Sequence, residues 1–164
     1  MSVRLDTEAD TRAFGAALGR ILEPGDLVLL TGPLGAGKTV LAQGIGSGLG
    51  VVGPITSPTF VIARVHRPDP ARGGRIPLVH VDAYRLGGAA DPRAEVDDLD
   101  LDASMDESVT VVEWGEGVVE QLAEAHLRVR VDRRADDARI VDLLPHGGTW
   151  SRRLATLGTA APAG

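Results

Sequence analysis

The chain has 164 residues, of which 43% are hydrophobic and 24% are charged, as is typical of a globular protein with one domain. No apolar run approaches the roughly 20 residues that cross a bilayer, and the acidic start lacks the apolar stretch of a secretory signal, so we expect a cytoplasmic protein without membrane contact. The lack of cysteine excludes disulfides and thiolate chemistry, and a net charge of −6 argues against a protein that coats DNA or RNA.

The first third of the chain contains a helix, a strand, a glycine-rich loop and a second helix. Apolar residues at helical spacing predict a helix over residues 7–22, with Asp6 or Thr7 as its cap. The continuous apolar run over residues 26–31 predicts a strand that is buried on both faces. Helical spacing resumes at residues 38–49, directly after the glycines. This order of strand, loop and helix is the context in which a phosphate-binding loop occurs.

The rest of the chain alternates between strands and less regular segments, which indicates an α/β fold in one domain over residues 1–157. Residues 116–125 favour a helix, residues 91–107 form an acidic segment with a short helix near Pro92, and residues 67–75 form an exposed, hairpin-like loop. We expect residues 158–164 to be a disordered tail. Further strands are predicted over residues 59–65, 76–82, 109–113, 127–131 and 139–144.

The glycine-rich segment matches the pattern G-x-x-x-x-G-K-[ST] of a phosphate-binding loop. In this pattern glycines turn successive backbone N–H groups toward phosphate oxygens, the lysine reaches the outer phosphates, and the hydroxyl binds Mg²⁺. Lys38 is the only lysine of the protein, since every other one of the 17 basic residues is arginine. The expected nucleotide contacts are Gly32, Pro33, Leu34, Gly35, Ala36, Gly37, Lys38, Thr39 and Val40.

Two carboxylates follow buried strands and are the predicted catalytic and metal-binding partners of the loop. Asp82 ends the apolar run over residues 76–81, and Glu113 ends the run over residues 109–112. Parallel strands deliver such residues to the same edge of a sheet, where one carboxylate orders Mg²⁺ and the other aligns the attacking water. The sequence leaves open which carboxylate has which role, and each of them also fits a simple strand end in solvent.

Four further residues near these motifs are candidate nucleotide contacts with competing structural explanations. His80 shares a strand face with Asp82 and either tunes the site or packs in the core. Ser57 and Thr59 flank Pro58 and belong either to a segment that senses the γ-phosphate or to a proline-bearing turn. Trp114 follows Glu113 and is either a core residue or a base-stacking residue beside the nucleotide.

Four motifs stand in order along the chain: TGPLGAGKT at residues 31–39, SPTF at 57–60, HVDAYRL at 80–86 and VVEW at 111–114. Together they resemble the TsaE (YjeE) family, the bacterial ATPases of tRNA threonylcarbamoyladenosine biosynthesis, over a similarity that extends to about residue 144. The resemblance implies a P-loop NTPase-like fold, in which a mostly parallel central sheet lies between two layers of helices. It also implies slow Mg²⁺-dependent hydrolysis of ATP to ADP in isolation, in the service of a two-subunit threonylcarbamoyl transferase with TsaD- and TsaB-like subunits, so that tRNA is a partner only indirectly.

The same resemblance implies individual roles for matching residues. Thr39 and Glu113 are similar to the family's metal ligands, and Asp82 is similar to its essential carboxylate. Residues near the nucleotide are implied at the N-terminus and at a downstream arginine, namely Thr7, Glu8 and either Arg134 or Arg139.

Two positions depart from the family pattern. Pro33 stands where the family usually has Asp, so the electrostatics of the loop differ, and the segment after Arg85 is more acidic and lacks the usual Glu-Leu-Gly. The second departure concerns a region expected to face a partner, so the details of docking are not carried over. The acidic residues of 91–107 face either a basic partner or water.

Three other functions compete with this interpretation. A GTPase would need a second lysine in an Asn-Lys-x-Asp element, which the sequence lacks, so adenine is favoured over guanine. A small-molecule kinase would use an arginine-bearing lid, for which Arg67, Arg72 and Arg75 are candidates. A switch module would bind nucleotide without turnover, which the presence of Asp82 and Glu113 disfavours.

Overall fold

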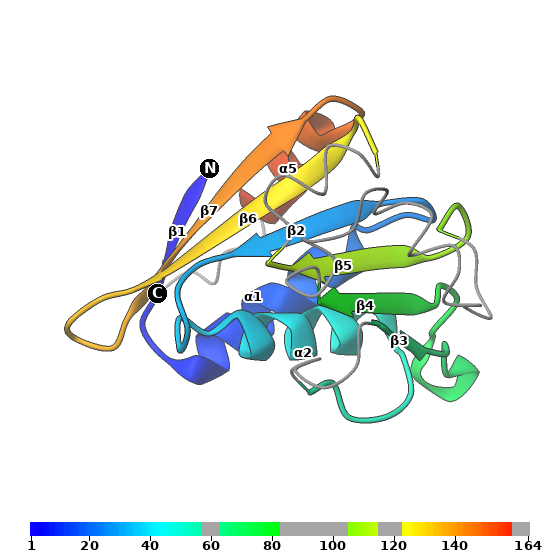
Figure 1. Cartoon of the computed structure of the whole chain (residues 1–164), viewed down its shortest axis with the longest axis horizontal. Helices are drawn as coiled ribbons and strands as arrows, with labels where there is room; N and C mark the ends of the chain where they lie inside the picture. Colours follow the sequence, from blue (N-terminus) through cyan, green and yellow to red (C-terminus); the bar gives the residue numbers. More distant parts are fainter. Residues whose placement is uncertain (57–62, 83–104, 115–122, 159–164) are drawn as a thin grey trace.

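The computed structural model describes residues 1–56, 63–82, 105–114 and 123–158, and within them a mixed sheet packs against helices (Figure 1). The helices are α1 (Glu8–Arg20), α2 (Lys38–Leu49) and α5 (Trp150–Gly158), with a short 3₁₀ helix at Pro70–Arg72. The strands are β1 (Ser2–Leu5), β2 (Leu27–Thr31), β3 (Ala63–His66), β4 (Leu78–Asp82), β5 (Val109–Glu113), β6 (His126–Arg133) and β7 (Arg139–His146).

The sheet has a parallel centre and antiparallel edges. Its seven strands follow the order β1-β7-β6-β2-β5-β4-β3. The neighbours β6, β2, β5 and β4 run parallel, whereas β3 pairs antiparallel with β4, and β7 pairs antiparallel with both β6 and β1. The predicted α/β fold with a mostly parallel centre is therefore confirmed. Strand β5 lies between β2 and β4 and runs parallel to both, so the carboxyl ends of the three strands lie at one edge of the sheet. Asp82 ends β4, Glu113 ends β5, and Gly32 directly follows β2 at this edge.

Strand β2 is buried on both faces, as its continuous apolar run predicted. Val28 and Leu30 belong to the larger core cluster, which also contains apolar residues of α1, α2 and α5. Leu27 and Leu29 point to the opposite face and join a second cluster with residues of β4 and β5. Alternate residues of a strand face opposite sides of the sheet, so β2 connects the two cores.

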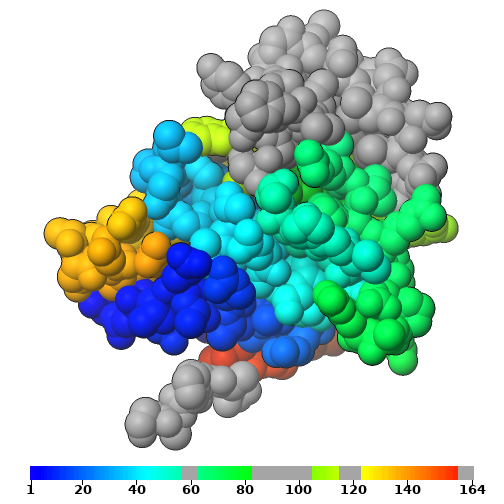
Figure 2. Space-filling view, turned by 90° about the horizontal axis from the view of Figure 1, so that it is seen from below, coloured from blue at the N-terminus to red at the C-terminus, as the bar shows by residue number. Residues whose placement is uncertain are grey.

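Helices α1 and α2 pack against each other through glycines, and they lie side by side in Figure 2. A Cβ atom added to Gly15 would lie 2.5 Å from the Leu41 carbonyl oxygen, and one added to Gly48 would lie 2.2 Å from the Ala16 carbonyl oxygen. The two backbones are therefore in direct contact, and only hydrogen fits at these positions. Helix α1 begins with a capping box, in which the Thr7 hydroxyl accepts from the backbone N–H of Asp10 and the Asp10 carboxylate accepts from that of Thr7.

Several elements differ from their sequence-based expectations. Strand β1 was not predicted, because four residues carry little periodic signal. Helix α5 was also missed, although its buried residues Trp150, Leu154 and Leu157 stand at helical spacing. The connection from β3 to β4 is hairpin-like as expected, but it contains the 3₁₀ helix, which Asp69 caps. The expected helix over residues 116–125 and most of the acidic segment over residues 91–107 lie outside the described residues, and residues 123–125 are not helical.

No described helix is both long enough and apolar enough to span a membrane.

Candidate functional site: a phosphate-binding loop at the carboxyl edge of the sheet

The loop between β2 and α2 requires glycine at two positions for steric reasons. Gly32 has a φ of 142°, and a Cβ atom there would lie 2.3 Å from the carbonyl oxygen of Val131. Gly37 has a φ of 108° and stands at the N-cap of α2 without a capping side chain. The first N–H groups of this helix consequently have no side-chain acceptor at the cap, and they carry the positive end of its dipole. Such an end is a binding site for anions.

Pro33, which replaces the family's usual Asp, starts a tight turn within the loop. Its carbonyl oxygen accepts from the backbone N–H of Ala36 at 3.1 Å, and Gly35 takes a φ of 79° at the third position of the turn. Proline has no backbone N–H, so this position supplies neither an amide donor nor a carboxylate. The turn explains how proline is tolerated at this position, and it uses the Ala36 N–H within the loop.

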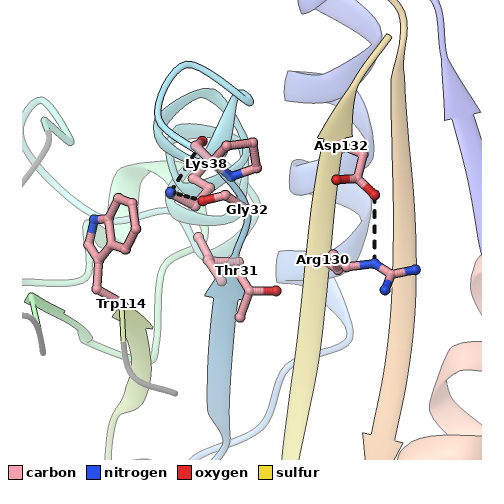
Figure 3. A pocket seen from close by; sticks show the side chains of 8 residues that line it. Thr31, Gly32, Lys38, Trp114, Arg130 and Asp132 are labelled. Atoms are coloured by element: carbon pink, nitrogen blue, oxygen red, sulfur yellow. Dashed lines mark hydrogen bonds and ion pairs between the residues drawn. The ribbon is translucent and has the colours of Figure 1, made fainter.

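Lys38 is buried beside the loop that it belongs to. Its ammonium group donates to the carbonyl oxygens of Gly32 at 2.5 Å and Pro33 at 3.5 Å, and it lies 3.8 Å from the centre of the Trp114 ring (Figure 3). Burial lowers the pKa of Lys38, and the negative charge of Glu113 opposes this shift. An ammonium group bonds more strongly to a charged phosphate than to carbonyl oxygens or an aromatic ring. A phosphate bound beside Lys38 could therefore replace these contacts.

Asp82 and Glu113 lie opposite each other at the ends of two parallel strands. The register pairs Asp82 with Glu113, and both residues are buried, with exposed fractions of 8% and 3%. Glu113 forms a hydrogen bond with His80, with 2.7 Å between Glu113 Oε2 and His80 Nε2. Thr39 and Glu113 line one cavity, whereas Asp82 lines neither cavity at the loop. Hydroxyl and carboxylate oxygens are the ligands that Mg²⁺ prefers. Among the described residues no group of three His, Cys, Asp or Glu could hold a metal ion.

Two cavities meet at Lys38 and Trp114. One, of about 270 Å³, is lined by loop and helix residues together with residues from β5 and β7, namely Leu34, Gly35, Ala36, Gly37, Lys38, Thr39, Val40, Glu113, Trp114 and Arg139. The other, of about 490 Å³, is lined by Leu30, Thr31, Gly32, Pro33, Lys38, Trp114, Arg130 and Asp132. The smaller cavity combines the loop amides, the lysine, the hydroxyl and a carboxylate, so it is the candidate phosphate site.

The structure separates the two arginines between which the sequence could not choose. Arg139 lines the phosphate cavity, and its Nε atom would lie 3.4 Å from a Cβ atom on Gly37. Arg134 lies in the turn between β6 and β7, and it lines neither cavity. Of these two arginines, Arg139 is the one that lines the candidate phosphate site.

Other predicted residues lie away from the cavities. His80 is fully buried and lines neither of them, so it is not placed to touch a nucleotide. Thr7 and Glu8 stand at the start of α1, where Thr7 caps the helix, and they also line neither cavity. Ser57 and Thr59 lie outside the described residues. Trp114 lines both cavities and is 46% exposed, which excludes the core position that was its alternative.

The sequence interpretation missed Arg130 and Asp132, which line the larger cavity. They lie on one face of β6, where charged residues alternate with the buried Val129 and Val131. Arg130 bonds to Asp142 at 2.7 Å and lies 3.7 Å from Asp132. The alternation in the sequence LRVRVDR was the available signal, because it predicts a strand with one open face.

The kinase alternative loses support from the position of Arg72. This residue pairs with Asp69 at 3.5 Å and lines a different cavity, together with Gln43 and Ser47. None of the described residues of that cavity belongs to the phosphate-binding loop. Arg72 is thus not placed as a lid residue over the phosphates.

Comparison with known proteins agrees with the motifs. The family model described as threonylcarbamoyl adenosine biosynthesis protein TsaE matches residues 5–141. The chain is 56% identical over 144 residues to the tRNA threonylcarbamoyladenosine biosynthesis protein TsaE of Streptomyces coelicolor, covering 85% of this chain and 93% of that protein. It is 33% identical over 142 residues to the Bacillus subtilis protein of the same name, covering 86% and 83%.

Comparison with solved structures supports the same assignment. The crystal structure of Bacillus subtilis YdiB superposes with a TM-score of 0.75 at 28% sequence identity, covering 99% of this chain and 96% of that one. The loop, the two carboxylates and the parallel centre of the sheet thus occur in a chain whose family model spans most of its length. The chain belongs to the TsaE family.

Proposed function

We propose that this protein is the ATP-binding and ATP-hydrolysing component of tRNA threonylcarbamoyladenosine biosynthesis. The observation that carries the proposal is the cavity of about 270 Å³ that joins Lys38, Thr39, Glu113 and Arg139. Relatives with 56% and 33% identity bear the name of this biosynthesis, which supports the biological role. The protein would act in the cytoplasm together with the TsaD- and TsaB-like subunits of the transferase.

The phosphates would lie against the amide groups of the loop and the start of α2. Lys38 would exchange its contacts with the Gly32 and Pro33 carbonyls for phosphate oxygens, and Arg139 would add a second cation from β7. Thr39, Asp82 and Glu113 would hold Mg²⁺, which neutralises phosphate charge when bound. Glu113 lines the cavity, so it is the better placed of the two carboxylates to touch metal or water there.

Adenine is the proposed base, because the sequence has no second lysine for a guanine-reading element. A competition assay with a fluorescent nucleotide tests this choice, using ADP and GDP as competitors. ADP should displace the probe at lower concentration, and a preference for GDP would contradict the assignment.

Phosphate release by the chain, with and without its own transferase subunits, tests the activity. We expect slow release from Mg²⁺-ATP alone and faster release with the subunits, because catalysis in this class depends on positioning. Glu113→Ala and Asp82→Ala should retain measurable nucleotide binding and lose the stimulated release. Wild-type release in both variants would overturn the assigned roles, and phosphorylation of a small acceptor in place of free phosphate would favour a kinase.

A further inference from the structure

The contact between His80 and Glu113 connects the interior of the sheet to the phosphate cavity. In the register between β4 and β5, His80 lies opposite Val111 and Asp82 lies opposite Glu113, so His80 reaches diagonally toward the strand end. The His80 side chain is 0% exposed and that of Glu113 is 4% exposed, with 2.7 Å between Nε2 and Oε2. Glu113 lines the phosphate cavity and His80 does not. The glutamate therefore has the histidine on its interior side and the cavity on the other.

The chemistry of the two groups fixes how they bond. An ionised carboxylate only accepts hydrogen bonds, so the bond to ionised Glu113 uses the tautomer with hydrogen on His80 Nε2, which donates to Oε2. This bond occupies Oε2 of Glu113 on the side that faces the interior of the sheet. The second oxygen remains for the cavity, which Lys38 and Arg139 also line.

We propose that His80 is a positioning residue that fixes the Glu113 carboxylate in the orientation needed at the metal and water end of the site. The inference rests on the proposed ATPase function and assigns His80 a role different from the nucleotide contact expected from its sequence. A glutamate has three rotatable side-chain bonds, and without the buried donor its carboxylate would sample several orientations. Second-layer hydrogen bonds of this kind orient metal-binding carboxylates, and misplacement of a catalytic group by about 1 Å can reduce the rate about 100-fold.

The test compares His80→Phe, which fills the space without a donor, with His80→Gln, whose amide nitrogen can donate from a similar position. His80→Phe should lower kcat for phosphate release about 10- to 100-fold and leave KM for ATP within about 3-fold. His80→Gln should recover most of the rate. Val81→Ala is the matched control, because Val81 is equally buried in β4 but belongs to the core cluster on the opposite face, and it should leave kcat unchanged.

A double variant separates an indirect role from a direct one. If His80 acts through Glu113, His80→Phe combined with Glu113→Gln should be no slower than Glu113→Gln alone. Multiplicative losses in the double variant would overturn the inference, as would wild-type kcat in His80→Phe or a loss that His80→Gln does not recover. Failure of the wild-type protein to release phosphate with its partners would instead contradict the proposed function.

Two readouts do not require turnover. Nitrogen NMR of the histidine side chains should show the Nε2–H tautomer for His80, assigned by its absence in His80→Gln, and its resonance should shift in Glu113→Ala. Binding of Mn²⁺ in the presence of ADP, followed by electron paramagnetic resonance, should weaken about 10-fold in His80→Phe and remain near wild type in His80→Gln. A His80 with the Nδ1–H tautomer, or unchanged Mn²⁺ affinity in His80→Phe, would contradict the inference. If His80→Phe fails to fold, the NMR measurement on the wild-type protein and the rate of His80→Gln still test the role of His80.

Discussion

Strand β2 is followed by the buried Lys38 at its carboxyl end and preceded by a half-buried ion pair at its amino end. The contacts that hold these two charged groups differ. At the amino end, Arg153 of α5 donates two hydrogen bonds to Asp26, at 2.5 and 2.9 Å, and a third to the carbonyl oxygen of Ile21 at 3.1 Å. The Arg153 guanidinium also lies 4.2 Å from the centre of the Trp150 ring. At the carboxyl end, Lys38 has two carbonyl oxygens and the ring of Trp114.

The difference is one of charge compensation. Asp26 and Arg153 neutralise each other through a bidentate pair, with side chains that are 12% and 13% exposed, and so attach α5 to β2. Among the described residues, the charge of Lys38 meets only dipoles and an aromatic face in direct contact, and burial lowers its pKa. Removal of one partner from the Asp26–Arg153 pair would leave the other charge uncompensated and destabilise the fold. The Lys38 charge has no ionic contact among the described residues, and it is available for an anionic ligand.

Among these substitutions, Lys38→Ala should cause the largest change, a loss of phosphate release. It tests whether the lysine at the carboxyl end of β2 serves a ligand and not the fold. Loss of the ammonium should reduce phosphate release about 100- to 1,000-fold, because one charged donor to the reacting phosphates disappears. The free energy of unfolding should change little, since the variant removes a buried charge that has no ionic contact in the part of the chain that the structure describes. Phosphate release and thermal unfolding measured on one preparation check both statements, and a large loss of stability with modest loss of rate would reverse the assignment of roles.

Gly48→Ala should destabilise the protein by about 3 kcal/mol, because a Cβ atom would lie 2.2 Å from a backbone oxygen of α1 and neither helix can yield as a flexible side chain would. Helix α2 begins at Lys38, so a shift of this helix should also weaken nucleotide binding. The variant therefore tests whether the position of Lys38 depends on the packing of α2 against α1. Denaturant unfolding and nucleotide titration measure the two effects. Gly158→Ala is the control, because a Cβ atom there has nothing within 4 Å and should change stability little.

Arg153→Ala should destabilise the protein by about 2 kcal/mol, less than a wholly buried pair would, because both side chains retain some exposure. Nucleotide affinity should stay within about 2-fold, since α5 lines neither cavity at the loop. Arg152→Ala, at an exposed position of the same helix, should change stability by less than about 0.5 kcal/mol. Equal effects of the two substitutions would show that the Asp26 pair contributes nothing.

The sequence predicted the carboxyl end of β2 much better than the amino end. The loop from Gly32 to Thr39 and the paired ends at Asp82 and Glu113 follow from local patterns, because a parallel sheet brings successive strand ends to one edge. The Asp26–Arg153 pair joins residues 127 positions apart, and no local pattern predicts such a contact. The helix contact through Gly48 had a signal in the repeated four-residue glycine spacing of both helices, but a chain with 21 glycines obscures it.

His80 shows the same limit within the site itself. Its place on the face of Asp82 followed from strand alternation, which correctly grouped it with the carboxylates. The diagonal bond to Glu113 depends on the register between β4 and β5, and register is set by the packing of the whole sheet. Proximity was thus predictable, while the direction of the side chain was not.

Substitution of Asp142 should change stability least, because its partner Arg130 lies on an open face of the sheet with a side chain that is 55% exposed. Hydrogen bonds from Ser2 and then from Arg130 lower the pKa of Asp142 below its ordinary value of 3.8. A depressed carboxyl pKa adds stability above the ordinary value, and this stability disappears as the pH falls through the depressed pKa. Asp142→Asn should therefore lower the thermal midpoint by about 1–3 °C at pH 7, and the difference from wild type should shrink as the pH falls below the ordinary value of 3.8. A difference that persists unchanged below that value would mean that packing, and not charge, holds this strand pair.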